Sequence, residues 1–301
     1  MLNFINTLII ASLLLPSGFN FLIQRSADFS FPSLAITKKI TGPQRINNKS
    51  LGLKTVAKSI LVVDDASGST LYSKNQSAVL PIASISKLMT ALVILDTKPD
   101  WSQVVKITKE DEREGGMVYF FEGEEVTVKD LFNAMLVASS NEAAIALARI
   151  SGFSDFSAAM NKKAAELKMS DSYFLDPSGL NPKNVSSAGD LVKLANAAFA
   201  RPEIAEATKA LDYKFEVLNN QRVGRAVNTD KLLDSYLNKG DYKIIGAKTG
   251  HLDEAGYCLL LRLEKKDIGS LTLVLMGIDN LPNRWQETKG LVDWVLDNYQ
   301  W

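Results

Sequence analysis

Cysteine, histidine and net charge are nearly absent from this sequence of 301 residues. With one Cys and one His, the chain has no disulfide framework and cannot build a zinc site from several Cys or His ligands. Lys and Arg number 34, as do Asp and Glu, so the formal net charge is zero and no basic excess favours nucleic acid or an anionic membrane surface. We therefore expect no metal ion, no cofactor and no nucleic-acid partner.

The scarcity of histidine also narrows the choice of catalytic mechanism. A Ser–His–Asp triad would have to use His251, and no Gly-x-Ser-x-Gly motif accompanies it. If the chain is a serine hydrolase, lysine is therefore the better candidate for the base. The remaining composition, 46% hydrophobic and 23% charged, is typical of globular proteins, and the length suits one large domain or two small ones.

Long apolar runs are missing too. The run at 4–15 is shorter than the roughly 20 residues that span a bilayer, and Pro16 and Gly18 follow it. Its length predicts a secretory signal peptide over 1–23, and hence an exported, periplasmic protein; retention as an anchor and a buried first helix are the alternatives. Residues 24–55, rich in Ser, Lys, Asn and Pro, are predicted to form a linker.

The rest of the chain, 56–301, alternates between strand and helix patterns. A strand hairpin at 60–72 precedes a mostly helical segment at 96–212, and further strands and a closing helix at 285–299 follow. We predict an α/β (α+β) fold in which the first hairpin and the last strands form one antiparallel sheet flanked by helices, with an all-α subdomain inserted and the functional site in the cleft between them. The expected helices are 83–95, 128–138, 141–150, 156–168 and 188–200, and the expected later strands are 213–218, 222–227, 243–249, 257–263 and 270–276.

A Ser-x-x-Lys motif, Ser84 and Lys87, lies at the start of the helix expected at 83–95. Residues three apart share a face of a helix, so the hydroxyl and the amine are within reach of each other, as a serine nucleophile and a lysine base require. The helix N-terminus would stabilise negative charge near Ser84, and Lys87 would need a pKa lowered by burial and by a second cation such as Lys248. The alternative is a helix cap beside a solvated lysine.

Ser139 and Asn141 form a second motif, Ser-x-Asn, at the junction of two expected helices. Ser139 is a candidate proton relay to a leaving nitrogen, and Asn141 is a candidate hydrogen-bond partner for a substrate amide. A helix cap explains these residue types equally well when the motif is taken alone. A similar Ser-x-Asn at Ser73 lies in the first hairpin, away from a helical junction, and is set aside.

A third motif, Lys248-Thr249-Gly250, ends an expected strand. Lys248 and Thr249 can bind a substrate carboxylate by charge and hydrogen bond, and Gly250 has no side chain to obstruct a substrate lying along the strand. The backbone N–H groups of Ser84 and His251 would form an oxyanion hole. An ordinary strand ending is the alternative for an isolated Lys-Thr-Gly.

Taken in order, the three motifs resemble the motif set of penicillin-binding proteins and serine β-lactamases. The blocks at 81–91, 139–144, 176–180 and 248–256 make the chain similar to the low-molecular-mass penicillin-binding proteins, the serine D-alanyl-D-alanine peptidases, over residues 56–300. The resemblance implies a β-lactamase/transpeptidase-like fold. About 50 residues follow the third motif, which implies no added C-terminal β domain and a protein most like the endopeptidase kind.

The resemblance further implies acylation of Ser84 by a D-Ala carbonyl and then hydrolysis, which would cut D-Ala–diaminopimelate cross-links in peptidoglycan. The partners would be peptidoglycan stem peptides, with β-lactam antibiotics as inhibitors, and peripheral association with the membrane or wall is compatible with this activity. The alternatives are a carboxypeptidase, a transpeptidase, a serine β-lactamase and a catalytically silent wall-binding module. The silent module would predict a broken motif, whereas Ser84, Lys87 and Lys248 are intact.

The chain departs from the family pattern in two places. Asp230 stands where a second Asn is expected, and Leu252 and Asp253 replace a polar Thr expected after His251. Both departures bear on substrate contacts and leave the three motifs intact. A class A β-lactamase also uses a Glu to activate its deacylating water, and Glu166 lies in an expected Ala-rich helix with no matching loop motif.

Overall fold

A computed structural model describes residues 42–47, 50, 52–113 and 115–301. The predicted signal peptide at 1–23 lies outside the described residues, as does most of the predicted linker. The chain from residue 40 onward forms one unit, and the elements below all belong to it.

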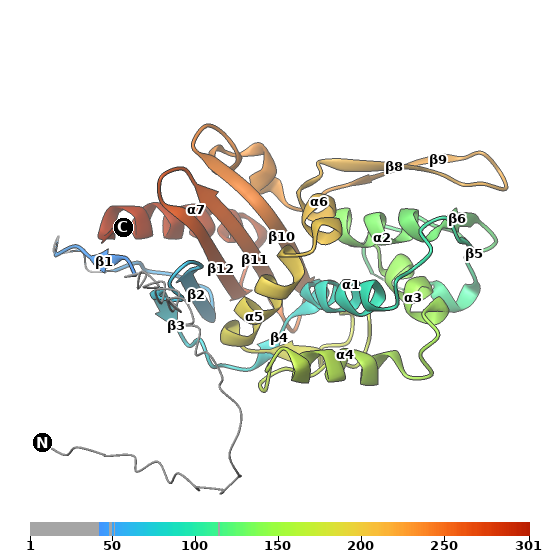
Figure 1. Ribbon diagram of the computed structural model, residues 1–301, viewed down its shortest axis with the longest axis horizontal. Coiled ribbons are helices and arrows are strands. Elements are labelled where there is room, and N and C mark those ends of the chain that lie inside the picture. The colour runs from blue at the N-terminus through green and yellow to red at the C-terminus, as the bar shows by residue number, and fades with distance from the viewer. Residues whose placement is uncertain (1–41, 48–49, 51, 114) are drawn as a thin grey trace, which may run out of the picture. The chain divides into compact units, whose positions relative to one another are not determined.

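The central feature is a five-stranded antiparallel sheet with the strand order β10-β11-β12-β2-β3 (Figure 1). The first hairpin joins the last strands through the pairing of β12 with β2, so the predicted antiparallel sheet is confirmed. The strands are β2 Ser59–Asp64, β3 Thr70–Lys74, β10 Tyr242–Leu252, β11 Gly256–Lys265 and β12 Gly269–Ile278.

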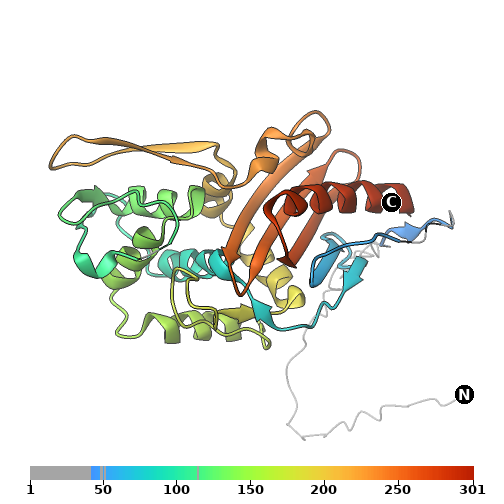
Figure 2. The ribbon, with the colours of Figure 1, turned by 180° about the vertical axis from the view of Figure 1, so that it is seen from behind.

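Alternate residues of the inner strands enter two different hydrophobic cores, because successive side chains of a strand point to opposite faces. In β2, Ile60 and Val62 join the core beneath α7 (Leu281–Asn298), whereas Leu61 joins the core shared with the other helices. Figure 2 shows α7 across one face of the sheet, and Figure 1 shows α5 (Ala188–Phe199) across the other. Coverage of both faces explains why these strands are nearly continuous apolar runs.

Helix α1, Ser86–Asp96, lies at the centre of the helical part. Every residue from Ser86 to Leu95 is buried, because α1 packs against α2, α3, α4 and α5. A helix that is covered on all sides is held rigidly, and its first turn therefore has a fixed position. The neighbouring helices are α2 Val128–Val137, α3 Asn141–Ile150, α4 Phe156–Glu166 and α6 Pro202–Lys209.

The two strands expected between the helical segment and the last strands form a hairpin outside the central sheet. β8, Asp212–Glu216, pairs with β9, Val223–Val227, and the hairpin runs alongside α2 (Figure 1). Phe215 packs on Phe120 of the loop before α2, with ring centroids 4.6 Å apart. An alternating pattern predicts strands but not their partners, and here packing against the helical part determines where the hairpin lies.

Three short strand pairs lie outside the central sheet: β1 Gln44–Arg45 with β13 Tyr299–Gln300, β4 Leu80–Pro81 with β7 Val185–Ser186, and β5 Val104–Lys106 with β6 Glu125–Thr127. Within the described ranges, no helix combines the length and apolar character needed to cross a bilayer. In the same part of the chain, no cluster of three or more His, Cys, Asp or Glu side chains is arranged to hold a metal ion.

Candidate active site

Ser84 lies in a single 3₁₀ turn, Ala83–Ile85, that leads directly into α1 and is called the Ser84 turn below. Ala83 has a left-handed φ of +48°, which bends the chain between β4 and the helix. The α-helix expected from residue 83 therefore begins at Ser86. The three-residue spacing still brings the two side chains together, since Lys87 Nζ donates a hydrogen bond to Ser84 Oγ at 2.9 Å.

The ammonium group of Lys87 is fully buried and is held by three oxygens. Besides Ser84 Oγ, these are Asn141 Oδ1 at 2.7 Å and the backbone oxygen of Ser178 at 2.5 Å. Burial lowers the pKa of Lys87 from 10.5 to about 7, against the smaller opposing effects of the Asp176 and Glu142 carboxylates. A neutral amine is therefore accessible to Lys87 near neutral pH.

The turn at 176–180 fixes the Ser178 carbonyl toward Lys87. The Asp176 carboxylate accepts hydrogen bonds from the backbone N–H groups of Ser178 at 2.7 Å, Gly179 at 2.8 Å and Asn181 at 2.8 Å. This is an Asx-type turn, in which an aspartate organises the backbone that follows it. The sequence marks these residues as a turn and as a family block, but it contains no signal that the Ser178 carbonyl would hold Lys87.

Ser139 and Asn141 reach the same site from the junction of α2 and α3. Ser140, between them, caps α3 by accepting a hydrogen bond from Ala143 N at 3.1 Å. Helix capping, the alternative role considered for Ser139 and Asn141, is therefore carried out by Ser140. Asn141, besides accepting from the buried lysine, donates from Nδ2 to the Gly115 carbonyl at 2.8 Å.

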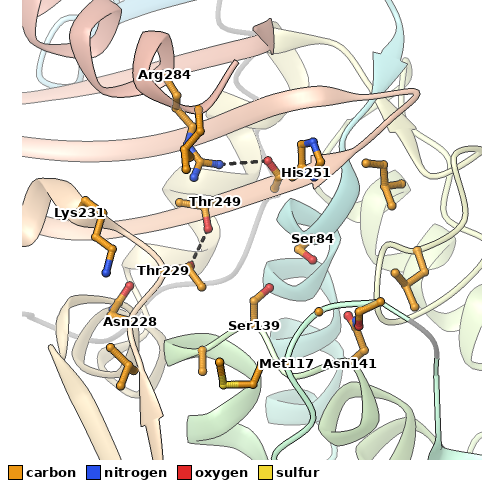
Figure 3. A pocket seen from close by; sticks show the side chains of 18 of the residues that line it. Ser84, Met117, Ser139, Asn141, Asn228, Thr229, Lys231, Thr249, His251 and Arg284 are labelled. Carbon is orange, nitrogen blue, oxygen red and sulfur yellow. Dashed lines mark hydrogen bonds between the residues drawn. The ribbon is translucent and has the colours of Figure 1, made fainter. Parts of the chain in front are cut away.

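Lys248 and Thr249 lie in β10, the edge strand that borders the Ser84 turn. Lys248 is buried, and its Nζ donates to Ser139 Oγ at 2.9 Å. The hydroxyls of Thr249 and Thr229 share a hydrogen bond of 2.6 Å (Figure 3). The fold therefore brings all three sequence motifs to one place.

Gly250 allows β10 to approach the Ser84 turn closely. A Cβ at this position would lie 2.8 Å from the Ile82 carbonyl oxygen and 3.1 Å from Ala83 Cβ. From the sequence, this glycine is predicted to leave room for a substrate. The close approach in the structure is to the chain's own backbone, so a side chain here would displace the Ser84 turn.

Three buried basic side chains, Lys87, Lys248 and Arg284, share this site. Burial lowers the pKa of Lys248 well below its usual range, and the charges of Lys87 and Arg284 lower it further. The sequence predicts that Lys248 lowers the pKa of Lys87. Burial is the leading cause for Lys87, and the effect of the neighbouring cation falls on Lys248.

Arg284 was not identified from the sequence. It lies on α7, and its Nη1 donates to the carbonyls of Gly250 at 3.2 Å and Cys258 at 3.4 Å. Asp230, noted from the sequence only as a departure from the family pattern, is buried nearby, and burial raises its pKa to about 6 against the charges of Arg284 and Lys248. No motif could mark Arg284, because the fold alone brings α7 next to β10.

A cavity of about 750 Å³ opens over these residues. Figure 3 shows Ser84, Ser139 and Thr249 around a common space, with Arg284 next to Thr249. His251 also lines the cavity, and its exposed ring is stacked on Tyr257 with centroids 4.1 Å apart. The arrangement offers a hydroxyl with an adjacent amine of lowered pKa, a second hydroxyl bonded to a second amine, and a cationic strand end.

Comparison with known proteins gives one consistent result. The family described as D-alanyl-D-alanine carboxypeptidase matches residues 45–280. D-alanyl-D-alanine endopeptidase of Escherichia coli is 34% identical over 243 residues, covering 79% of this chain and 76% of that protein. D-alanyl-D-alanine carboxypeptidase DacF of Bacillus subtilis is 32% identical over 253 residues, covering 81% of this chain and 63% of that protein, so the chain spans under two thirds of DacF.

A solved structure agrees with these relatives. A penicillin-binding protein of Listeria monocytogenes in its cefotaxime-bound form superposes with a TM-score of 0.71 at 27% identity, covering 82% of this chain and all of that one. The fold expected from the sequence motifs, an antiparallel sheet with inserted helices of the β-lactamase/transpeptidase type, is therefore confirmed.

Proposed function

The chain belongs to the D-alanyl-D-alanine carboxypeptidase family of serine peptidases, and from that premise we propose that it cleaves D-alanyl bonds of peptidoglycan stem peptides through an acyl-enzyme on Ser84. The observation that carries the proposal is the 2.9 Å hydrogen bond between Ser84 Oγ and the buried Lys87 amine. The substrate lies outside the cytoplasmic membrane, so the activity requires export, in agreement with the signal peptide predicted at 1–23.

In the first step, neutral Lys87 accepts the proton of the Ser84 hydroxyl as Oγ attacks the D-Ala carbonyl carbon. The backbone N–H groups of Ser84 and His251 stabilise the resulting oxyanion. Lys87 is already aligned by Asn141 and Ser178, so little ordering accompanies the step. In this mechanism Asn141 positions the base, and only the second N–H of its Nδ2 is left for a substrate amide.

Collapse of the tetrahedral intermediate breaks the C–N bond, and the leaving nitrogen takes a proton from Ser139. Lys248 donates a hydrogen bond to Ser139 Oγ at 2.9 Å and is placed to replace that proton. The substrate carboxylate binds at Lys248 and Thr249, with the charge of Arg284 behind them.

In deacylation, the oxygen of a water molecule bonds to the acyl carbon while the water gives one proton through Ser139 to Lys248. The bond between Ser84 Oγ and the acyl carbon then breaks, and Ser84 Oγ takes the proton held by Lys87. A carboxylic acid leaves, and both amines return to their starting protonation states.

We propose that the bond cut is the D-Ala–diaminopimelate cross-link, so that the protein is an endopeptidase inhibited by β-lactams. The endopeptidase relative of E. coli and the open cavity beyond Thr249 support this choice. Trimming of the terminal D-Ala from a pentapeptide is the second candidate, supported by the similarity to DacF.

The purified protein from about residue 24 onward should be offered a cross-linked dimer and a monomeric pentapeptide, each with and without penicillin. Penicillin-sensitive cleavage of the dimer alone is the expected result. Loss of only the terminal D-Ala from the pentapeptide would make the protein a carboxypeptidase. If neither is cut and penicillin does not label Ser84, the proposal is wrong.

The lowered pKa of Lys87 predicts a pH-dependent acylation rate. Lys87 acts as a base only when neutral, so the second-order rate constant for acylation by penicillin should rise with pH through about 7 and level off above it. The measurement is a stopped-flow or mass-spectrometric acylation rate from pH 5 to 9. A flat profile over this range would contradict the assignment of Lys87 as the base.

Replacing Gly179 by alanine should slow acylation by roughly 100-fold through misplacement of reacting groups. Gly179 has a φ of +82°, and a Cβ there would lie 2.1 Å from the Ala83 carbonyl oxygen and 2.9 Å from Ser84 N. The matched control is Gly152→Ala, which has a φ of +83° and nothing within 4 Å of the new Cβ. Equal acylation rates in the two variants would show that the close packing of the 176–180 turn on the Ser84 turn is unimportant.

A further inference from the structure

The cavity continues past Thr249 to the first turns of α7. Leu281 and Trp285, four residues apart and thus on the same side of the helix, both line it. Leu281 is 42% exposed and Trp285 is half-buried. This surface, called the α7 wall below, consists of the side chains of Leu281 and Trp285, with Arg284 between them in sequence.

Trp285, the larger side chain of the α7 wall, is held in place by stacked groups. The Arg284 guanidinium lies over the Trp285 ring at 4.2 Å and over the Tyr257 ring at 5.2 Å. The ring of His251, on the adjacent strand β10, stacks on Tyr257 of β11. Arg284 is fixed in turn by the Gly250 and Cys258 carbonyls. A rigid apolar surface binds an aliphatic group with little loss of conformational entropy.

The wall lies next to the site proposed for the substrate carboxylate. Arg284 lies next to Thr249 in Figure 3, and Trp285 is the next residue along α7. The residue that leaves on cleavage carries its carboxylate and its side chain on the same carbon atom. Thr249 and the wall line one cavity, so a carboxylate bound at Lys248 and Thr249 leaves the wall open to a long side chain more than to the methyl group of alanine.

We propose that the α7 wall is the subsite for the aliphatic side chain of the leaving residue and that Leu281 and Trp285 select a diamino acid over alanine at that position. The proposal rests on the proposed function, since it needs a D-alanyl bond to be cut. Endopeptidases and carboxypeptidases share the three motifs, so the motifs cannot determine which substrate is preferred. The proposal assigns that selection to Leu281 and Trp285.

The preference can be measured with two short peptides that differ only in the residue after the scissile D-Ala. One ends in D-alanine and the other in D-norleucine, whose unbranched butyl chain imitates the methylenes of a diamino acid. The unaltered protein should show a higher kcat/KM for the D-norleucine peptide. Leu281→Ser and Trp285→Ala should each lower the ratio of the two kcat/KM values by roughly tenfold, the size of effect expected for an apolar subsite.

Leu218→Ser is the matched control, because Leu218 is 47% exposed and does not line the cavity. It should leave the ratio unchanged. Because Trp285 also packs on the core, Leu281→Ser is the decisive variant if Trp285→Ala fails to fold. Taking a ratio removes any change in the common catalytic steps.

The outcomes separate the two proposals. If the unaltered protein cleaves both peptides with equal kcat/KM, or if Leu281→Ser leaves the preference intact, the subsite proposal is wrong and the proposed function stands. If no D-alanyl peptide or cross-linked dimer is cut although penicillin acylates Ser84, the proposed function is wrong and the subsite proposal falls with it.

Discussion

Replacing Ser84 by alanine should abolish both peptide cleavage and labelling by penicillin. Loss of the nucleophile in a serine hydrolase lowers kcat by about 10⁶-fold, and among the residues that the structure describes no other hydroxyl lies within a hydrogen bond of Lys87. The fold should survive, because Lys87 keeps its bonds to Asn141 and Ser178 when Ser84 Oγ is removed. The measurements are mass-spectrometric detection of the acyl-enzyme, turnover of the cross-linked dimer, and the melting temperature.

Ser73→Ala is the control for this variant. Ser73 is exposed on β3, belongs to the second Ser-x-Asn of the sequence, and donates to Gln76 Oε1 at 3.1 Å. The Ser73→Ala variant should be acylated at Ser84 at the rate of the unaltered protein. An acyl-enzyme that still forms in Ser84→Ala would show that the nucleophile had been misassigned.

Replacing Lys87 by methionine should slow acylation by about 10³- to 10⁴-fold, as expected when a general base is removed. Methionine has a similar length and no charge, so it relieves the burial of an amine while leaving the Ser178 carbonyl without its donor. We expect these effects on stability to offset each other in large part. The residual acylation should no longer rise with pH through 7, because the titrating amine is gone.

Two comparisons make this test decisive. Lys193→Met changes a lysine that pairs with Asp190 outside the cavity and should leave acylation unaffected. Lys248→Met removes the other buried amine. If Lys87→Met retains the rate and the pH profile while Lys248→Met loses both, Lys248 is the base and the assignment made here is wrong.

The sequence predicts the sheet and the helices that cover it well, because a strand that is buried on both faces is a continuous run of apolar residues. β2, β11 and β12 are largely apolar runs bounded by turns, and the structure pairs them within one antiparallel sheet as expected. The same pattern did not reveal that β8 and β9 lie outside the sheet. Alternation reports that one side of a strand is buried, but the burying surface, here α2 and Phe120, is chosen by tertiary packing.

For the site, sequence spacing succeeds where contacts are local and fails where they are distant. Ser84 and Lys87 are three residues apart, so helical geometry alone predicts their hydrogen bond. The Ser178 carbonyl lies 91 residues from Lys87, and the Arg284 side chain lies 34 residues from the Gly250 carbonyl that it contacts. Every residue has a backbone carbonyl, so no sequence motif could predict the contact between the Ser178 carbonyl and Lys87.

The burial of α1 has a consequence for how the site responds to heat and denaturant. From Ser86 to Leu95 no residue of this helix faces solvent, so its amide hydrogens can exchange with water only when the helices around it come apart. Lys87 therefore lies on a segment that unfolds only when the surrounding helices separate. Ser84, one turn earlier, lies next to Ala83, whose backbone is strained. Partial unfolding that frees the turn but spares α1 would separate the hydroxyl from its amine, so activity would be lost before the core melts.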